Sequence, residues 1–279
     1  MIRYITPLAA TTLALTAIPA LAQTVGVNAA VVNDVRMTTQ AQPALHKAVV
    51  KERVSLGNDI QTGRGSVLQV MLLDRTTFTV GGNARIKVDR FVYDPNRKAS
   101  AVGLSVAKGA FRFMSGKPLH ANPGQSSIRT PVASIGIRGT IVEGAIGPDA
   151  IRIARAEAGV PAGFAADPET ASLILLRGPG PNAQGATPGA IDVAGGGTTV
   201  AVTSPGFAVF VPGPGQAPIG PFALSDTGSD ALAGLLRDAR PQAGAIDDPL
   251  ASNPIIDQYF ERNREDTPQP GQGQDPVNP

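Results

Sequence analysis

An all-β fold is predicted for this chain by three observations. Apolar and polar residues alternate in short runs, turn-forming residues separate these runs at close spacing, and helical periodicity is absent from residues 23 to 155. Side chains two positions apart share one face of a strand, so such runs are typical of half-buried strands joined by tight turns. We expect a β-roll, a sandwich or a solenoid-like stack of many short strands.

The strand signals follow one another in the first half of the chain. The first is apolar almost throughout, as in a strand buried on both faces, and the next two alternate as half-buried strands do. Two more surround the Lys108–Gly109 pair, which we interpret as a turn. The expected strands cover residues 67–73, 77–80, 85–89, 104–106 and 110–113.

Composition changes near residue 156. Glycine and proline make up 35 of the last 124 residues, a proportion typical of loops and disorder. We therefore expect a main β domain at 23–155, a Gly/Pro-rich β extension packed on it at 156–215, and an acidic tail at 216–279. The expected elements beyond 155 are strands at 173–176, 198–203 and 207–211, a helix at 229–239 capped by Ser229, a helix at 253–262, and disorder from about 263.

The first 22 residues have the organisation of a secretory signal peptide. A short positive start at Arg3 is followed by an apolar stretch, which ends in Ala20-Leu21-Ala22. An uncleaved anchor is the alternative. No later window approaches 18 apolar residues, so we expect no transmembrane segment after cleavage. Export together with the absence of cysteine predicts a periplasmic or secreted protein of a Gram-negative bacterium.

Charge is divided along the chain. Residues 47–155 hold 17 basic and 7 acidic residues, whereas residues 156–279 hold 5 basic and 14 acidic residues. A basic surface attracts anions, so an anionic envelope component is one class of partner. Two other interpretations stay open: the acidic tail masks the basic domain, or the charges are simply solvated.

Residues that carry catalysis or cofactor binding are scarce. The chain has no cysteine and no tryptophan, and its two histidines, His46 and His120, lie far apart in sequence. Metal sites and catalytic triads need clustered ligands or bases, and no phosphate-binding or dinucleotide motif is present. We therefore expect no cofactor, no metal, no specific nucleic acid and no enzyme activity. A glycan hydrolase with paired carboxylates stays open, since the spacing of such a pair is spatial.

The most informative segment is residues 128–140, which read Ile-Arg-Thr-Pro-Val-Ala-Ser-Ile-Gly-Ile-Arg-Gly-Thr. It resembles the T-P-x-A-x-x-G-x-R-G-T stretch of FecR-like domains, and the resemblance covers about residues 45 to 145. The matching positions are Thr130, Pro131, Ala133, Gly136, Arg138, Gly139 and Thr140. Glycine and proline at such positions favour turns, close strand approach and sheet edges.

Two positions depart from the family pattern. Asn58 separates the Gly57 and Asp59 that are adjacent in the family. Arg75 stands where the family often has the glycine of an Asp-Gly-Ser/Thr turn. Because a turn that needs a positive backbone angle resists arginine, we expect a different turn type there.

The resemblance implies an extracytoplasmic binding and signalling module. The best-known members relay a signal from an outer-membrane receptor to a cytoplasmic sigma factor, but we expect this chain to lack their cytoplasmic region. We therefore expect a stand-alone module that binds an envelope protein or an anionic envelope component. Arg129 and Arg138 are the candidate contacts, because an arginine fork binds carboxylate or phosphate; alternatively, each fixes a nearby loop. A self-associating secreted structural or adhesin-type module is the alternative function, and the sequence does not settle the oligomeric state.

Overall fold

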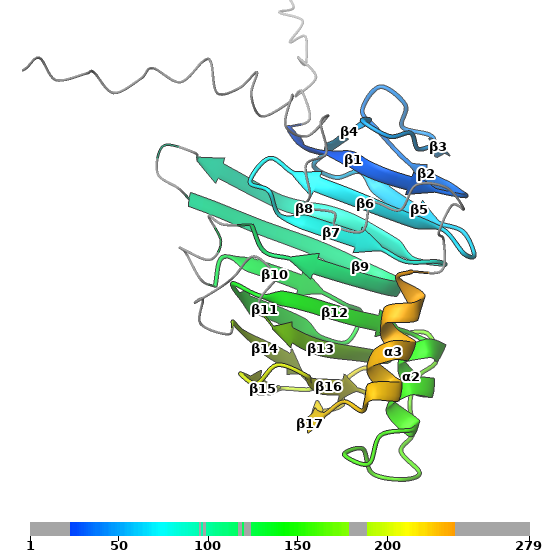
Figure 1. The fold of residues 1–279 in the computed structure, drawn as a ribbon, viewed down its shortest axis with the longest axis vertical. Coiled ribbons are helices and arrows are strands. Elements are labelled where there is room, and N and C mark those ends of the chain that lie inside the picture. The colour runs from blue at the N-terminus through cyan, green and yellow to red at the C-terminus, as the bar shows by residue number, and fades with distance from the viewer. Residues whose placement is uncertain are drawn as a thin grey trace, which may run out of the picture. The chain divides into compact units, whose positions relative to one another are not determined.

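The computed structural model describes residues 23–94, 96, 99–116, 119, 124–178 and 189–237. The chain divides into two compact units, Met1–Arg240 and Pro241–Pro279. All of the described residues belong to the first unit. The expected signal peptide and the expected helix at 253–262 lie outside the described residues. The described residues form seventeen strands and two helices labelled α2 and α3, which confirms the all-β class (Figure 1).

The strands form two sheets, which we call sheet A and sheet B. Every neighbouring pair is antiparallel except β9 and β10, which run parallel. Sheet A has the order β4 (Arg53–Ser55), β1 (Thr24–Val32), β6 (Val67–Leu72), β7 (Thr77–Val80), β9 (Ala99–Met114), β12 (Ile141–Ile146), β13 (Ser172–Gly178), β16 (Phe207–Val211) and β17 (Ile219–Ala223). Sheet B has the order β3 (His46–Lys47), β2 (Val35–Met37), β5 (Asp59–Thr62), β8 (Arg85–Asp94), β9, β10 (Ser126–Arg129), β11 (Ser134–Arg138), β14 (Ala190–Gly195) and β15 (Thr198–Val202).

Strand β9 belongs to both sheets. Residues before Gly109 pair with β8 and β10 in sheet B, and residues from Gly109 onward pair with β12 and β7 in sheet A. Gly109 has a φ of 83°, and a Cβ there would lie 2.4 Å from Cβ of Ala84. Only glycine combines this backbone with so close an approach. The two strands expected at 104–106 and 110–113 are therefore one strand that changes sheets at Gly109.

The two sheets enclose the main core. Alternating residues of most strands face it, including Phe78, Phe111 and Phe113 from sheet A and Leu104 and Ile128 from sheet B. The alternation holds in β6 too, where every second residue is buried. The expectation that this strand is buried on both faces was wrong, because Gln69 and its outward neighbours remain half-exposed.

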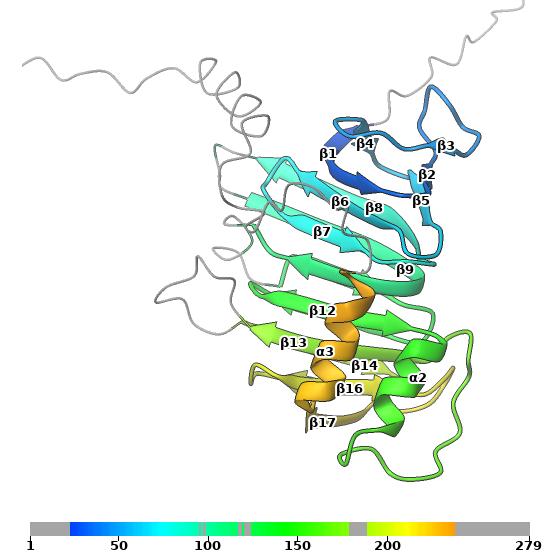
Figure 2. The same cartoon turned by 45° about the vertical axis from the view of Figure 1, so that its right-hand side comes forward.

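Both helices cover the outer face of sheet A (Figure 2). Helix α2 (Pro148–Arg155) was missed at the sequence level, since it is a short interruption of a β region. It starts with proline in its first turn and buries Ala150, Ile153 and Ala154 on one side, the spacing of a helical face.

Helix α3 (Asp226–Leu235) begins earlier than expected. Its cap is Ser225 rather than Ser229, and Ser225 Oγ accepts a hydrogen bond from the Gly228 amide at 3.0 Å. Glu157, at the end of the α2 segment, accepts hydrogen bonds from the Ser225 amide (2.9 Å) and hydroxyl (2.8 Å). The carboxylate therefore joins the two helices at the start of α3, where negative charge is favourable.

The expected boundary at residue 156 does not interrupt the sheets. Strand β13 pairs with β12 in sheet A, and β14 pairs with β11 in sheet B. The described strands after residue 156 therefore extend both sheets directly instead of forming a layer packed on them.

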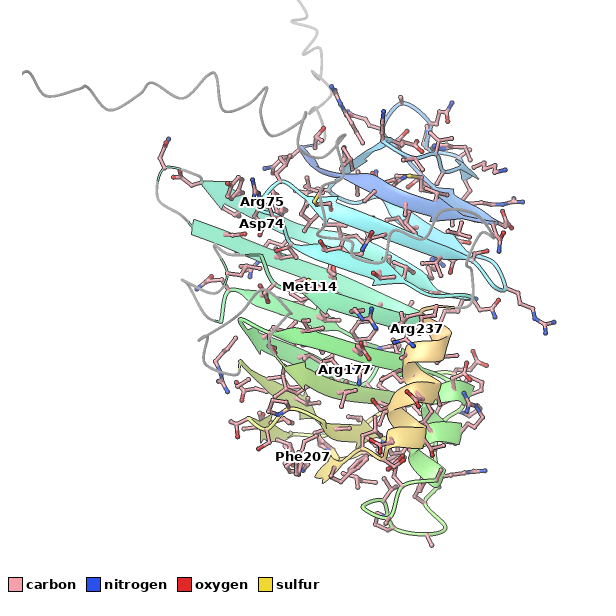
Figure 3. The ribbon with its side chains drawn as sticks, viewed as in Figure 1. Asp74, Arg75, Met114, Arg177, Phe207 and Arg237 are labelled. Atoms are coloured by element: carbon pink, nitrogen blue, oxygen red, sulfur yellow. The ribbon has the colours of Figure 1, made fainter. Side chains whose placement is uncertain are left out.

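The turn at Asp74–Arg75 differs from the expectation (Figure 3). Arg75 has a φ of 66°, so an arginine does occupy the left-handed backbone region here. The buried Asp74 carboxylate accepts hydrogen bonds from the Thr76 amide and hydroxyl, both at 2.9 Å, and from the Ser100 hydroxyl. These bonds hold the turn against the steric cost at Arg75, about 1–2 kcal/mol for an L-residue.

A buried ion cluster lies on the outer face of sheet A. The Glu143 side chain on β12 is 1% exposed and accepts a hydrogen bond from Arg112 Nε on β9 at 2.7 Å. Arg177 Nε on β13 lies 3.4 Å from the same Oε1, and Arg177 Nη1 donates to the Ser229 hydroxyl on α3. One carboxylate thus links three strands, and one of its two arginines also contacts the helix.

Candidate functional site

The signature segment forms the connection from β10 through β11 to β12. Thr130 opens a tight turn: its Oγ1 accepts a hydrogen bond from the Ala133 amide at 3.0 Å, and its amide donates to the Ala133 carbonyl at 2.9 Å. Pro131 lies inside this turn. Gly139, with a φ of 57°, then takes the chain from sheet B to sheet A.

Thr140 anchors the end of the segment. Its side chain is buried, its hydroxyl donates to the Gly178 carbonyl at 3.0 Å, and its amide donates to the Ser115 hydroxyl at 3.2 Å. The polar groups at both ends of the segment therefore bond within the fold, as buried polar groups generally must. These residues define the path of the backbone between the two sheets.

Arg138 and Arg129 lie at opposite ends of the β10–β11 ladder. Arg138 donates two hydrogen bonds to the Asp192 carboxylate on β14, at 2.5 Å and 3.1 Å. Arg129 is exposed and makes no hydrogen bond or ion pair with any described residue. The structure therefore does not bring the two candidate contacts together. Of these two, Arg129 is the one whose guanidinium has no partner among the described residues.

Arg129 borders a hollow of about 330 Å³ on the outer face of sheet B. We call it the Gly103 hollow, because the register places Gly103 between Arg90 on β8 and Ser127 on β10. A Cβ at Gly103 would lie 3.2 Å from Cβ of Arg90 and 3.8 Å from the Ser127 hydroxyl oxygen. The missing side chain therefore opens the surface. The residues that line the hollow are Asp89, Arg90, Gly103, Leu104, Ser127 and Arg129.

A β-bulge places two charged residues at this hollow. The register with β9 shifts between Val88 and Arg90, and the burial pattern shows Asp89 and Arg90 both exposed while Val88 and Phe91 are buried. Such bulges redirect side chains and are common beside functional sites. Arg90 Nη2 donates to the Gln125 carbonyl at 3.1 Å, and its other N–H groups have no partner among the residues that the structure describes.

Basic residues continue across the same face toward the N-terminal strands. Register pairs Lys47 with Arg36, Arg36 with Gln61, Gln61 with Arg85, and Arg85 with Lys108, so these side chains form one row across the sheet. Lys47 and Lys108 have no acidic partner among the described residues.

Two further cations on this face, Arg85 and Arg36, have acidic partners. Arg85 Nε donates to both Asp59 carboxylate oxygens at 3.1 Å, and this hydrogen bond, with the charge of Asp59, raises the pKa of Arg85 above its ordinary value. Arg36 Nε lies 3.2 Å from an oxygen of Asp34. Among the described residues, the cations of this face without an acidic partner are therefore Arg90, Arg129, Lys47, Lys87 and Lys108.

Sequence reasoning missed most of the hollow. Asp89 and Arg90 interrupt an otherwise strict alternation between Val88 and Phe91, and two consecutive polar residues there are the signal of a bulge. Gly103 inside a strand is a second signal, since strand glycines often mark close approach or a bulge.

Histidine and metal chemistry add little to this site. His46 Nε2 lies 2.6 Å from Glu52 Oε1, a contact that the sequence did not predict because six positions separate the two residues. His46 belongs to β3 and is not among the residues that line the hollow. Among the described residues, no group of three or more His, Asp or Glu is arranged to hold a metal ion. The described part of the chain also includes no helix with the length and apolarity needed to cross a membrane.

Comparison with known proteins identifies the domain. The family model described as FecR protein matches residues 58–160, which include the signature segment and every residue of the Gly103 hollow. A search of curated proteins gives no match. Two crystal structures of a candidate anti-sigma factor from Parabacteroides distasonis are similar at 13% and 12% identity, with TM-scores of 0.37 and 0.35. Each similarity covers 57% of this chain and 57% of that chain. As the signature segment predicted, the chain contains a FecR domain, which spans residues 58–160.

Proposed function

We propose that this chain is a non-enzymatic binding module of an envelope signalling pathway, and that it acts in the periplasm through protein–protein contacts. The FecR match supports a role in signal transduction. The observation that carries the proposal is the outer face of sheet B, where a FecR domain presents an open hollow beside the unpaired Arg129. Open, charged surfaces of this kind steer and orient protein partners.

A flat sheet face suits recognition better than turnover. The polar groups around the hollow lie on three neighbouring strands and face solvent, so a partner can contact several at once. Water is not excluded there, whereas catalysis by charge stabilisation works best in a closed, dry site. The periplasmic location is inferred from the signal peptide expected at residues 1–22.

Envelope crosslinking with mass spectrometry tests the proposal. The chain from Gln23 to Pro279 would carry a photocrosslinker at Ser105, beside the hollow, or at Thr79 on the outer face of sheet A as the matched control. We expect one envelope protein to crosslink at Ser105 and not at Thr79, with a yield that falls as salt is raised. Equal recovery from both positions, or from neither, would contradict the proposed role of this face.

One observation favours a second candidate function, the self-associating structural module. Strand β15 ends sheet B, reads Thr-Thr-Val-Ala-Val, and carries no charge or proline. Other edges are protected: β3 has two residues, and β17 contains Pro221. Sedimentation of the chain over a hundred-fold concentration range tests this candidate. A mass that rises with concentration in wild type but not in Thr199→Lys would support it, and a constant monomer mass would remove it.

A further inference from the structure

We propose that the Gly103 hollow binds a single carboxylate of a protein partner, at an acidic side chain followed by an apolar one. This inference rests on the proposed function and adds the chemistry of the contact. The hollow supplies the donors, the charge and the neighbouring apolar surface that such a motif needs.

The donors converge from two strands that flank β9. Arg129 and Ser127 are two apart on β10, so both project on the outer face, and Arg90 projects from β8 across Gly103. Among the described residues, none bonds to the five N–H groups of Arg129 or to the Ser127 hydroxyl. An arginine fork binds both oxygens of a carboxylate, and a hydroxyl from the same strand adds a third hydrogen bond.

The charge of the hollow fits a monoanion. Arg90 and Arg129 contribute two positive charges and Asp89 contributes one negative charge. Asp89 accepts a hydrogen bond from the Ser105 hydroxyl, which holds the carboxylate at the rim. A net charge of about +1 is neutralised by one carboxylate, whereas a phosphate monoester with a charge near −2 would be repelled by Asp89.

The surroundings favour a peptide over a sugar. Val92 follows Arg90 on the same face of β8 and is 54% exposed, so an apolar side chain next to the bound carboxylate can cover it. The lining of the hollow contains no aromatic ring. The apolar face of a sugar ring packs well on a flat aromatic ring, and this lining offers none.

Titration by NMR tests the inference on the chain from Gln23 to Pro279. The probe is the blocked dipeptide acetyl-Glu-Leu-amide, compared with acetyl-Gln-Leu-amide, glucuronate and inorganic phosphate. We expect saturable shifts of the Gly103, Ser127 and Arg129 amides with the Glu dipeptide, at millimolar affinity. The Gln dipeptide should bind at least about ten-fold more weakly, because a charge-assisted pair is lost.

Three variants make the test specific. Arg129→Gln should weaken binding about ten-fold, and Arg129→Lys should restore only part of it, since a lysine keeps the charge but not the fork. Lys47→Gln is the matched control, because it removes an exposed cation from the same face outside the hollow. It should leave binding unchanged.

The outcomes separate this inference from the proposed function. Equal binding of the Glu and Gln dipeptides, or an equal effect of Arg129→Gln and Lys47→Gln, would overturn the carboxylate site. Tighter binding of glucuronate or phosphate would overturn the choice of a protein carboxylate. Envelope crosslinking at Ser105 that persists in Arg129→Gln would leave the signalling role intact while this site fails. Specific binding of the Glu dipeptide without any envelope crosslink would support the carboxylate site and contradict the proposed signalling role.

Discussion

Arg138 and Asp192 are separated by 54 positions and form a two-bond ion pair across strands β11 and β14. Both side chains are partly exposed, at 40% and 36%. The arginine of the signature segment thus ties the FecR domain, which ends at residue 160, to a strand beyond it.

This pair predicts a modest and coupled effect on stability. Arg138→Gln and Asp192→Asn should each lower the free energy of unfolding by about 0.5–1 kcal/mol, because exposure to solvent screens the pair. The double variant should lose less than the sum of the single losses, as a double-mutant cycle in urea would measure. Strict additivity would mean that the pair contributes nothing in solution.

The strained turn at Arg75 predicts a stabilising substitution. Glycine adopts a φ of 66° without the steric cost that arginine bears, although it also gains entropy when unfolded. We expect Arg75→Gly to raise the free energy of unfolding by about 0.5–1 kcal/mol. Arg75→Ala is the control, since it removes the long side chain but keeps the Cβ. A similar gain in both variants would show that the backbone is not the cause.

The crossing of β9 predicts a large effect at one glycine. Gly109→Ala should lower the free energy of unfolding by about 3 kcal/mol or more, because the new methyl group would overlap Ala84 in addition to straining the backbone. Gly57 is the matched control: its φ is 81°, but nothing lies within 4 Å of a Cβ there. Gly57→Ala should cost about 1 kcal/mol. Urea midpoints of the two variants measure the difference, and equal losses would contradict the packing argument.

The cluster around Glu143 predicts that the stability of the fold depends on the ion pair between Glu143 and Arg112. Removing Arg112 leaves the buried carboxylate with only the longer contact to Arg177, so Arg112→Met should cost about 3 kcal/mol. Adding Glu143→Gln to this variant should recover part of the loss, because a neutral amide is easier to bury. Arg152→Met, which breaks the exposed pair with Asp149, is the control and should cost less than about 0.5 kcal/mol. Thermal unfolding monitored by circular dichroism would rank the variants, and no recovery in the double variant would contradict the argument.

The sequence was most informative where a structural rule is local. The strand at 77–80 has the expected bounds, and the strands expected at 198–203 and 207–211 occur within one residue of their predicted ends. Alternation of apolar residues is enough for this, since period two directly reports a half-buried strand. The FecR signature likewise consists of neighbouring residues whose turns can be read from one segment.

Features that depend on distant partners were not predictable. Asp192 pairs with Arg138 across two strands that nothing in the spacing relates, and the Gly103 hollow exists only because β8, β9 and β10 become neighbours. Arginine is disfavoured at a positive φ, yet Arg75 adopts one because the buried Asp74 supplies hydrogen bonds that offset the strain. Sequence reasoning therefore identified Arg129 as a candidate but could not find the residues around it.

Strand β9 has a consequence for how the chain assembles. Strands β1 to β8 pair only with one another or with β9, and strands β10 to β17 pair only with one another or with β9. During synthesis, which proceeds from the N-terminus, all the strand partners of β1 to β8 are therefore present once Met114 has left the ribosome. The second half can then grow from the other edges of a template that already exists, so few pairings must wait for residues far along the chain.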